Sequence, residues 1–255
     1  MKGSRKNHDF CWINLITPKL AEAAGFFQRV FDWKFADGIP GGYVIQVDGL
    51  AAGAMIDIDA CPPGVPPSIG VLVKVADADA TVARVKALGG RADDVVDIHE
   101  NGRMAICTDP NGGVFGLWQP LSKDGAECDT QAPGAPTWFE TLTTDLDRAV
   151  EFYVDLFGWS PRSEHPAPGM NYTVFHLGDA PIAGAMVLPP DKMSGVPPHW
   201  GVYFAVTNTD ETVRLATSLG ATLCVPPHDI PNVGRFALMQ SPQGVAFHVI
   251  QYAAQ

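Results

Sequence analysis

The segment CWINLITPKLAEAAGFFQRVFDW at residues 11–33 returns later in the chain as TWFETLTTDLDRAVEFYVDLFGW at residues 137–159. Trp12 aligns with Trp138 and Trp33 aligns with Trp159, so both ends of the segment keep the same offset. Each copy begins with alternating apolar residues, which are typical of a half-buried strand. It continues with apolar residues three and four positions apart, which are typical of one helix face. The segment therefore predicts a strand–helix unit that occurs twice.

The repetition continues through the rest of both halves. Three further pairs of segments match: AAGAMID (51–57) with IAGAMVL (182–188), GVPPSIGVLVKV (64–75) with GVPPHWGVYFAV (195–206), and NGRMAICTDPNGGVFGLWQP (101–120) with VGRFALMQSPQGVAFHVIQY (233–252). A repeat of this extent indicates a duplication over nearly the whole chain. Residues 121–136 are polar and rich in Gly, Pro and Ala, as interdomain linkers are. The sequence thus predicts one domain at residues 8–120, a linker at 121–136 and a second domain at 137–255.

Each half contains two shorter modules of its own. Strand, helix and strand patterns begin near Trp12 and again near Ile69, and the second half repeats them near Trp138 and Trp200. Each module follows the order β-α-β-β-β. The sequence predicts an α+β fold made of four βαβββ modules.

The composition excludes several classes of partner. The chain has 255 residues, is 46% apolar and carries a formal net charge of −11. Such a charge argues against nucleic acid and against anionic membrane surfaces as partners. No apolar run reaches the roughly 18–20 residues that a membrane-spanning helix needs. No apolar segment of a secretory signal follows the N-terminus, and the five scattered cysteines contain no CxxC pair, so we expect a cytoplasmic protein with reduced thiols.

Two motifs make the pattern more specific. The helix segment TDLDRAVEFYVDLFGW (144–159) and the closing strands TDPNGGVFGLWQP (108–120) resemble the vicinal oxygen chelate superfamily. That superfamily includes glyoxalase I, extradiol dioxygenases, and fosfomycin and bleomycin resistance proteins. The resemblance covers almost the full chain and is greatest to two-domain glyoxalase-like proteins. It implies two tandem glyoxalase-like domains, in which paired modules form sheets that curl into a cup.

The resemblance also implies where metal ligands would lie. Metal-using members carry a His on the first strand of a module and a Glu on the last strand. The corresponding positions here hold Trp12, Trp138, Gly70, Gly201, Gly116 and His248. An indole has only an N–H donor and cannot ligate a metal, so His248 is the one credible ligand among them. We therefore expect neither a bound metal nor a cofactor.

The same strands supply the candidate pocket residues. Trp12 and Trp138 either fill the cups with apolar bulk or form a stacking wall for a small ligand. Asn14 and Glu140 follow two positions later, on the same strand face. A carboxylate there is costly unless it is paired or solvated, so Glu140, together with His248, is the candidate for acid–base chemistry. Two further residues, Tyr172 and His176, are candidates for lining the second cup.

Two functions remain open from the sequence. The first is binding of a small-molecule ligand without a metal, as bleomycin resistance proteins do. The second is a lyase or isomerase of glyoxalase type, acting on a small carbonyl compound through a metal or through Glu140 and His248. The pairing of modules is also open: Glu140 and His248 share a cup only if modules one and two pair, and modules three and four pair. Because four modules can complete their own cups, we expect a monomer or a homodimer.

Overall fold

The computed structural model describes residues 5–164, 171–188 and 195–253. The first half contains β1 (Phe10–Thr17), α1 (Leu20–Phe31), β2 (Lys34–Ile39), β3 (Gly42–Val47), β4 (Leu50–Asp57), η1 (Ile58–Ala60), β5 (Ser68–Lys74), α2 (Ala78–Ala87), β6 (Arg91–Ala92), β7 (Val96–Ile98), β8 (Gly102–Thr108) and β9 (Val114–Pro120). The second half contains β10 (Pro136–Thr143), α3 (Leu146–Phe157), β11 (Ser160–Glu164), β12 (Tyr172–Leu177), β13 (Ala180–Val187), β14 (His199–Ala205), α4 (Thr209–Ser218), β15 (Thr222–Ile230), β16 (Gly234–Gln240) and β17 (Ala246–Tyr252). The predicted α+β fold of two tandem glyoxalase-like halves is confirmed.

Two mixed sheets form the framework. The first has the strand order β2-β3-β4-β1-β5-β9-β8-β6, with β7 beside β8, and the second has the order β11-β12-β13-β10-β14-β17-β16-β15. In both sheets the first strands of two modules pair antiparallel, β1 with β5 and β10 with β14. Modules one and two therefore share a sheet, as do modules three and four. Of the two pairings that the sequence left open, this one places Glu140 and His248 in the same sheet.

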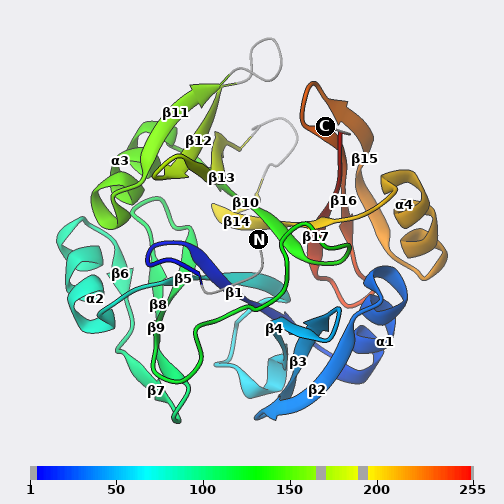
Figure 1. Cartoon of the computed structure of the whole chain (residues 1–255), viewed down its shortest axis with the longest axis horizontal. Coiled ribbons are helices and arrows are strands. Elements are labelled where there is room, and N and C mark those ends of the chain that lie inside the picture. Colours follow the sequence, from blue (N-terminus) through cyan, green and yellow to red (C-terminus); the bar gives the residue numbers. More distant parts are fainter. Residues whose placement is uncertain (1–4, 165–170, 189–194, 254–255) are drawn as a thin grey trace.

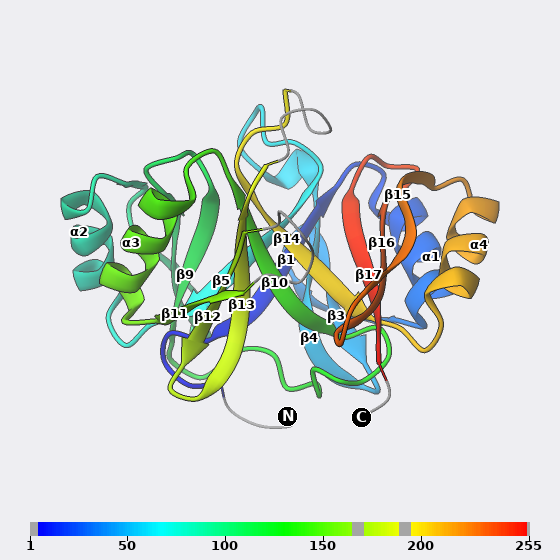
Figure 2. The same cartoon turned by 90° about the horizontal axis from the view of Figure 1, so that it is seen from above.

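The two sheets curl in opposite directions (Figure 1). Strands β1, β5, β10 and β14 cross the middle of the molecule, and each sheet curves away from them, so that one cup opens at the bottom of the view and the other at the top. The helices lie on the two flanks, with α1 beside α4 and α2 beside α3 (Figure 2). Each helix pair thus joins the two halves. None of the helices in the described ranges is long and apolar enough to cross a membrane.

One hydrophobic core runs through both halves. Phe10 of the first half stacks on Phe139 of the second, with ring centroids 4.2 Å apart. The tryptophan that ends each repeated segment makes a contact outside its own half, because Trp33 Nε1 donates to the Gly134 carbonyl of the linker and Trp159 Nε1 donates to the His8 carbonyl of the first half, both at 2.8 Å. These two indoles are buried, so the repeated segment ends in a structural tryptophan.

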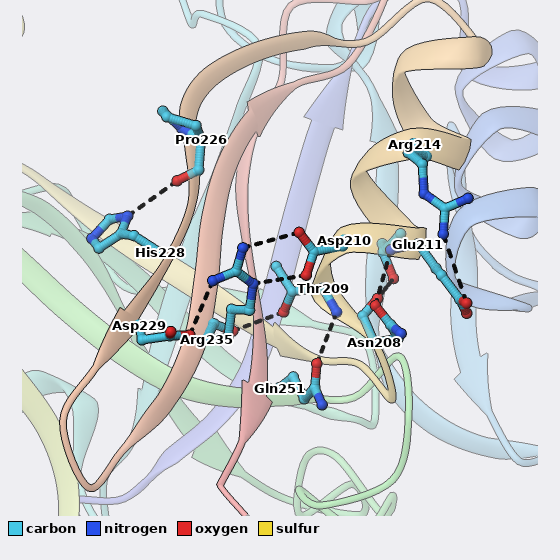
Figure 3. Close-up of polar contacts among 11 residues, drawn as sticks. Asn208, Thr209, Asp210, Glu211, Arg214, Pro226, His228, Asp229, Arg235 and Gln251 are labelled. Atoms are coloured by element: carbon cyan, nitrogen blue, oxygen red, sulfur yellow. Dashed lines mark hydrogen bonds and ion pairs between the residues drawn. The ribbon is translucent and has the colours of Figure 1, made fainter.

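The start of the second helix in each half is held in the same way (Figure 3). In α4, Asn208 caps the backbone N–H of Glu211, and the Gln251 side chain accepts from the N–H of Thr209. Arg235 of β16 binds Asp210 through two nitrogens and reaches an aspartate of β15 through a third. The first half repeats these contacts with Asp77, Gln119, Arg103, Asp79 and Asp97. The duplication therefore extends to polar contacts that hold each helix against its sheet.

Candidate functional site

The concave face of the second sheet carries the predicted site residues on its central strand, β10. Trp138 and Glu140 both line the cavity there. A register shift between Pro136 and Trp138 marks a β-bulge, and β1 has the same shift between Phe10 and Trp12. Bulges re-aim side chains near functional sites. Here the bulge lets Phe10 remain in the core while Trp12, two residues later, lines the cavity.

Two tyrosine hydroxyls hold the Glu140 carboxyl group. Tyr172 on β12 donates to Oε2 at 2.8 Å, and Tyr203 on β14 donates to Oε1 at 3.0 Å. The Tyr172 hydroxyl also accepts from Trp138 Nε1 at 2.9 Å. A buried carboxyl group is costly unless it is hydrogen-bonded, and both oxygens of Glu140 are satisfied in this way. The result is a continuous polar chain from Trp138 through Tyr172 and Glu140 to Tyr203.

Two glycines on the strands beside β10 make room for this arrangement. Glu140 pairs with Gly184 on β13 and with Gly201 on β14. A Cβ at Gly184 would lie 1.8 Å from the Tyr172 hydroxyl, and a Cβ at Gly201 would lie 2.9 Å from Cε1 of His248. Any side chain at these glycines would displace Tyr172 or His248. The missing side chains are therefore a condition for the site.

His248 lies on the far side of Tyr203. It is paired with Tyr203 across β14 and β17, and the two rings stack with centroids 4.3 Å apart and planes 15° apart. Its Nδ1 atom is buried and has no hydrogen-bond partner in the described part of the chain. Leaving such a group unpaired costs about 1–3 kcal/mol, and such costs concentrate at functional sites. Glu140 and His248 thus flank Tyr203, and no hydrogen bond joins them directly among the described residues.

Burial sets the protonation of these groups. It lowers the pKa of His248 to about 4, and the nearby His199 acts in the same direction. Burial also raises the pKa of Glu140, against the opposing effect of its two tyrosine hydrogen bonds. The pKa values of Tyr172 and Tyr203 are raised by burial and by the Glu140 carboxyl group. At neutral pH His248 is a neutral imidazole and both tyrosines keep their hydroxyl protons.

The structure separates the remaining predicted residues. Trp12 and Asn14 line the concave face of the first sheet, and the open space along the two concave faces amounts to about 2500 Å³. Trp12 and Trp138 are only half-buried, so neither cup is filled by its indole. His176 is buried on β12 and is not among the residues that line the cavity. Its Nδ1 atom lies 3.3 Å from the Val174 carbonyl oxygen of the same strand.

The positions where metal-using relatives carry ligands do lie on the concave faces. They are Trp12, Gly70 and Gly116 in the first cup and Trp138, Gly201 and His248 in the second. His248 alone offers a lone pair, and a stable divalent metal site needs three or four converging donors. No group of three or more His, Cys, Asp or Glu side chains suited to a metal occurs among the described residues. The residues at these positions do not fit a metal ion.

Tyr203, which contacts both Glu140 and His248, was not among the site residues predicted from the sequence. The signal was present, because Tyr203 follows Gly201 by two positions and therefore shares its strand face. Its aligned residue in the first half is Leu72, which hides the polar role from the repeat comparison. Only the contact with Glu140 shows that this tyrosine belongs to the site.

Comparison with known families supports the fold. A model described as the Glyoxalase/Bleomycin resistance protein/Dioxygenase superfamily matches residues 10–117 and 136–249. The protein CFP32 of Mycobacterium bovis, provisionally named a glyoxylase, is 38% identical over 251 residues, which cover 96% of this chain and 95% of CFP32. The anthracycline biosynthesis protein DnrV of Streptomyces peucetius is 34% identical over 257 residues, which cover 94% of this chain and 92% of DnrV.

Solved structures share the architecture at low sequence identity. The Mn(II)-bound glyoxalase from Novosphingobium aromaticivorans has a TM-score of 0.64 at 16% identity, covering 98% of this chain and 83% of that one. An extradiol ring-cleaving dioxygenase from B. fuscum has a TM-score of 0.67 at 12% identity, covering 100% of this chain and 74% of that one. These likenesses establish the fold alone.

Proposed function

The chain belongs to the glyoxalase/bleomycin resistance protein/dioxygenase superfamily, and on that basis we propose that its second cup binds a small organic molecule without a protein-held metal ion. The polar chain around Glu140 would recognise a hydrogen-bonding group of this ligand. Trp138 would support an apolar or aromatic part of it. Neutral His248 would offer a further hydrogen bond.

The observation that carries the proposal is the Glu140 carboxyl group, held in a cavity wall by two hydroxyls at 2.8 and 3.0 Å. Two hydrogen bonds and two glycines position a group whose burial is otherwise unfavourable. Such preorganised polar groups in a largely apolar concave site are typical of ligand pockets. A role in packing alone would be served better by an apolar residue at this position.

The names of the relatives suggest which ligands to try. One relative is provisionally named a glyoxylase and another is named for anthracycline biosynthesis. A screen by thermal shift should include small aldehydes, thiol adducts, phenolics, polycyclic quinones and cationic drugs, with and without divalent metals. A ligand at 100 times its Kd stabilises the folded state by about 2.7 kcal/mol, which such a screen detects.

The proposal is tested by titrating a screened ligand into variants of the two cups. We expect Glu140→Gln to weaken binding about tenfold or more, because the amide replaces an ionisable carboxyl group that would form a hydrogen bond with the ligand. The matched variant Asn14→Asp alters the equivalent position of the first cup and should leave the affinity unchanged. Equal binding by wild type and Glu140→Gln would contradict the proposal. So would stoichiometric zinc, nickel, iron or manganese in elemental analysis of the purified protein.

One observation favours a second candidate, a lyase or isomerase acting on a small carbonyl compound. Glu140 accepts a hydrogen bond from the hydroxyl of Tyr203, neutral His248 stacks on the ring of the same tyrosine, and the pKa values of Glu140 and His248 are moved in opposite directions from their ordinary values. A carboxylate in such a site can accept a proton from a carbon next to a carbonyl and return it to the neighbouring carbon. Glu140 would be the base, Tyr203 would orient its carboxyl group, and neutral His248 would be a hydrogen-bonding partner for the substrate.

Exchange of substrate hydrogen with deuterated water distinguishes catalysis from binding. Metal-free protein should catalyse exchange at the carbon beside the carbonyl of a methylglyoxal–thiol adduct if the second candidate holds. Glu140→Gln and His248→Gln should each remove this exchange while the fold, followed by circular dichroism, persists. Binding without exchange would leave the first candidate as the function.

A further inference from the structure

The first cup has an aromatic surface of its own. Trp12 on β1 and Trp118 on β9 line the cavity, and both are half-buried. Ile106 and Val114 also line it and are 37% and 52% exposed. Exposed apolar side chains that gather on a concave surface mark ligand-binding grooves. This cup therefore presents flat apolar walls that the described protein does not cover.

The first cup has open space at a position where the imidazole of His248 lies in the second cup. Gly116 is the equivalent of His248 in the first sheet. Gly116 of β9 pairs with Leu72 of β5, and His248 of β17 pairs with Tyr203 of β14. A Cβ at Gly70 would meet only the Asn14 carbonyl oxygen, at 3.8 Å. At the equivalent Gly201 the imidazole of His248 lies within 2.9 Å of such a Cβ. The space beside Gly70 is therefore open in the first cup, although Leu72 lies 2.9 Å from a Cβ placed at Gly116.

The polar side chains that β1 and β3 present to the first cup are uncharged amides. Asn14 replaces Glu140 and, with Gln46 of β3, faces the cavity. Neither amide side chain makes a hydrogen bond within the described ranges, although each offers two donor hydrogens and an acceptor oxygen. No ionisable side chain lies on the central strands at this level, because Leu72 replaces Tyr203 and Gly116 replaces His248. The strand-borne floor of the cup is neutral and has unused hydrogen-bonding capacity.

The segment between the two halves closes one end of this cup. Trp118 Nε1 donates to the Lys123 carbonyl at 2.9 Å, and the N–H of Glu127 donates to the Ala51 carbonyl at 2.7 Å. Gly125 lies so close to β1 that a Cβ there would be 2.5 Å from the Cys11 carbonyl oxygen. Lys123, Gly125 and Glu127 all line the cavity. The interdomain segment is thus a fixed wall, and it also orients one of the two tryptophans.

We propose that the first cup is a separate binding site for an uncharged, flat aromatic molecule with carbonyl and N–H groups at its edge. The indoles of Trp12 and Trp118 contact its ring faces, and the amides of Asn14 and Gln46 pair with its polar edge. Amides match neighbouring carbonyl and N–H groups in two hydrogen bonds. A neutral ligand suits a floor that offers no opposite charge. This site goes beyond the proposed function and is independent of it, because it uses the other cup.

The test uses lumichrome, a neutral heteroaromatic molecule with this edge, as a fluorescent probe of the full-length protein. Saturable quenching of the probe should appear on titration with wild-type protein. Trp12→Leu and Gln46→Leu should each weaken binding about tenfold, the range expected for loss of one stacking or hydrogen-bonding partner. Trp138→Leu and Glu140→Gln change the second cup and should leave the affinity within twofold.

A second measurement does not depend on variants that fold poorly. Protein labelled with 5-fluorotryptophan gives one ¹⁹F resonance for each of its six tryptophans. Lumichrome should move the resonances of Trp12 and Trp118 and leave that of Trp138 unchanged. The proposal is overturned if wild-type protein shows no saturable binding up to about 1 mM, or if the resonance of Trp138 moves instead. Absence of lumichrome binding would leave ligand binding by the Glu140 site untouched, and movement of the Trp138 resonance would support that site while overturning this one.

Discussion

The buried imidazole of His248 should make the stability of this protein depend on pH in a defined window. Burial lowers the pKa of His248 from its ordinary value of 6.5 to about 4. Between these two values the unfolded chain binds a proton at this residue and the folded chain does not. Protonation therefore favours unfolding, and the stability due to His248 is present above pH 6.5 and is lost as the pH falls toward 4. The difference between the two pKa values corresponds to about 3 kcal/mol.

Urea unfolding at several pH values measures this contribution. Wild type and His248→Gln should be compared at pH 4, 5, 6 and 7, with the free energy of unfolding extrapolated to water. The glutamine has no charge to gain, so the difference between the two proteins isolates His248. We expect wild type to gain about 3 kcal/mol relative to His248→Gln between pH 4 and pH 7.

A constant difference across this range would refute the reasoning. It would mean that His248 is protonated equally in both states, and hence that its surroundings admit a charge. A difference that grows in the opposite direction, toward low pH, would mean that the folded state holds the imidazolium. In that case the unpaired Nδ1 atom would have a partner when the chain is folded, and its role in the site would need a different account.

Four further outcomes are expected from the same unfolding assay. Because burial raises the pKa of Glu140 above 4.5, wild type should lose stability relative to Glu140→Gln as the pH rises past that value, and a rise instead would contradict the burial argument. The hydroxyl of Tyr153 donates to the buried Asp109 and accepts from Trp200 Nε1, so Tyr153→Phe should lower the free energy of unfolding by about 2–4 kcal/mol. This is expected even though the equivalent residue of the first half, Phe27, is a phenylalanine. Asp145→Ala should cost about 1 kcal/mol, because its carboxylate caps α3. Lys19→Ala at the equivalent position of α1, which makes no side-chain cap, should change stability by less than about 0.5 kcal/mol.

The sequence predicted the elements whose pattern is strong. The repeated apolar periodicity gave the helices that the structure places at Leu20–Phe31 and Leu146–Phe157, together with the central strands. Both boundaries of α3 have residues that suit them, because Asp145 caps its start and Gly158 ends it in the left-handed conformation. The βαβββ order included the edge strands, but their residues were not assigned, because a strand exposed on both faces, as along the whole of β11, has no apolar alternation to detect.

The candidate site was also predicted in part, where it depends on the alternation of side chains along a strand. Strand alternation placed Trp138 and Glu140 on one face, and the family pattern added His248 on β17. The shared strand with Tyr172 did not distinguish His176, which is buried away from the cavity, and alternation gave no reason to select Tyr203 among the aromatic residues of its strand. Hydrogen bonds between strands depend on which strands are neighbours, and a sequence read locally does not contain that information.

The duplication, the βαβββ order and the absence of ligand-type side chains at five of the six positions where metal-using relatives carry them follow from residue type and spacing along the chain. The pairing of modules three and four in one sheet, which brings Glu140 and His248 to either side of Tyr203, is evident only in the folded chain. The structure also shows that the cups of the two duplicated halves differ in chemistry. The second cup contains the buried carboxyl group of Glu140, and the first contains the amides of Asn14 and Gln46. Pairing of distant strands sets these contacts, and such pairing is fixed by burial of the whole core, which no single segment specifies.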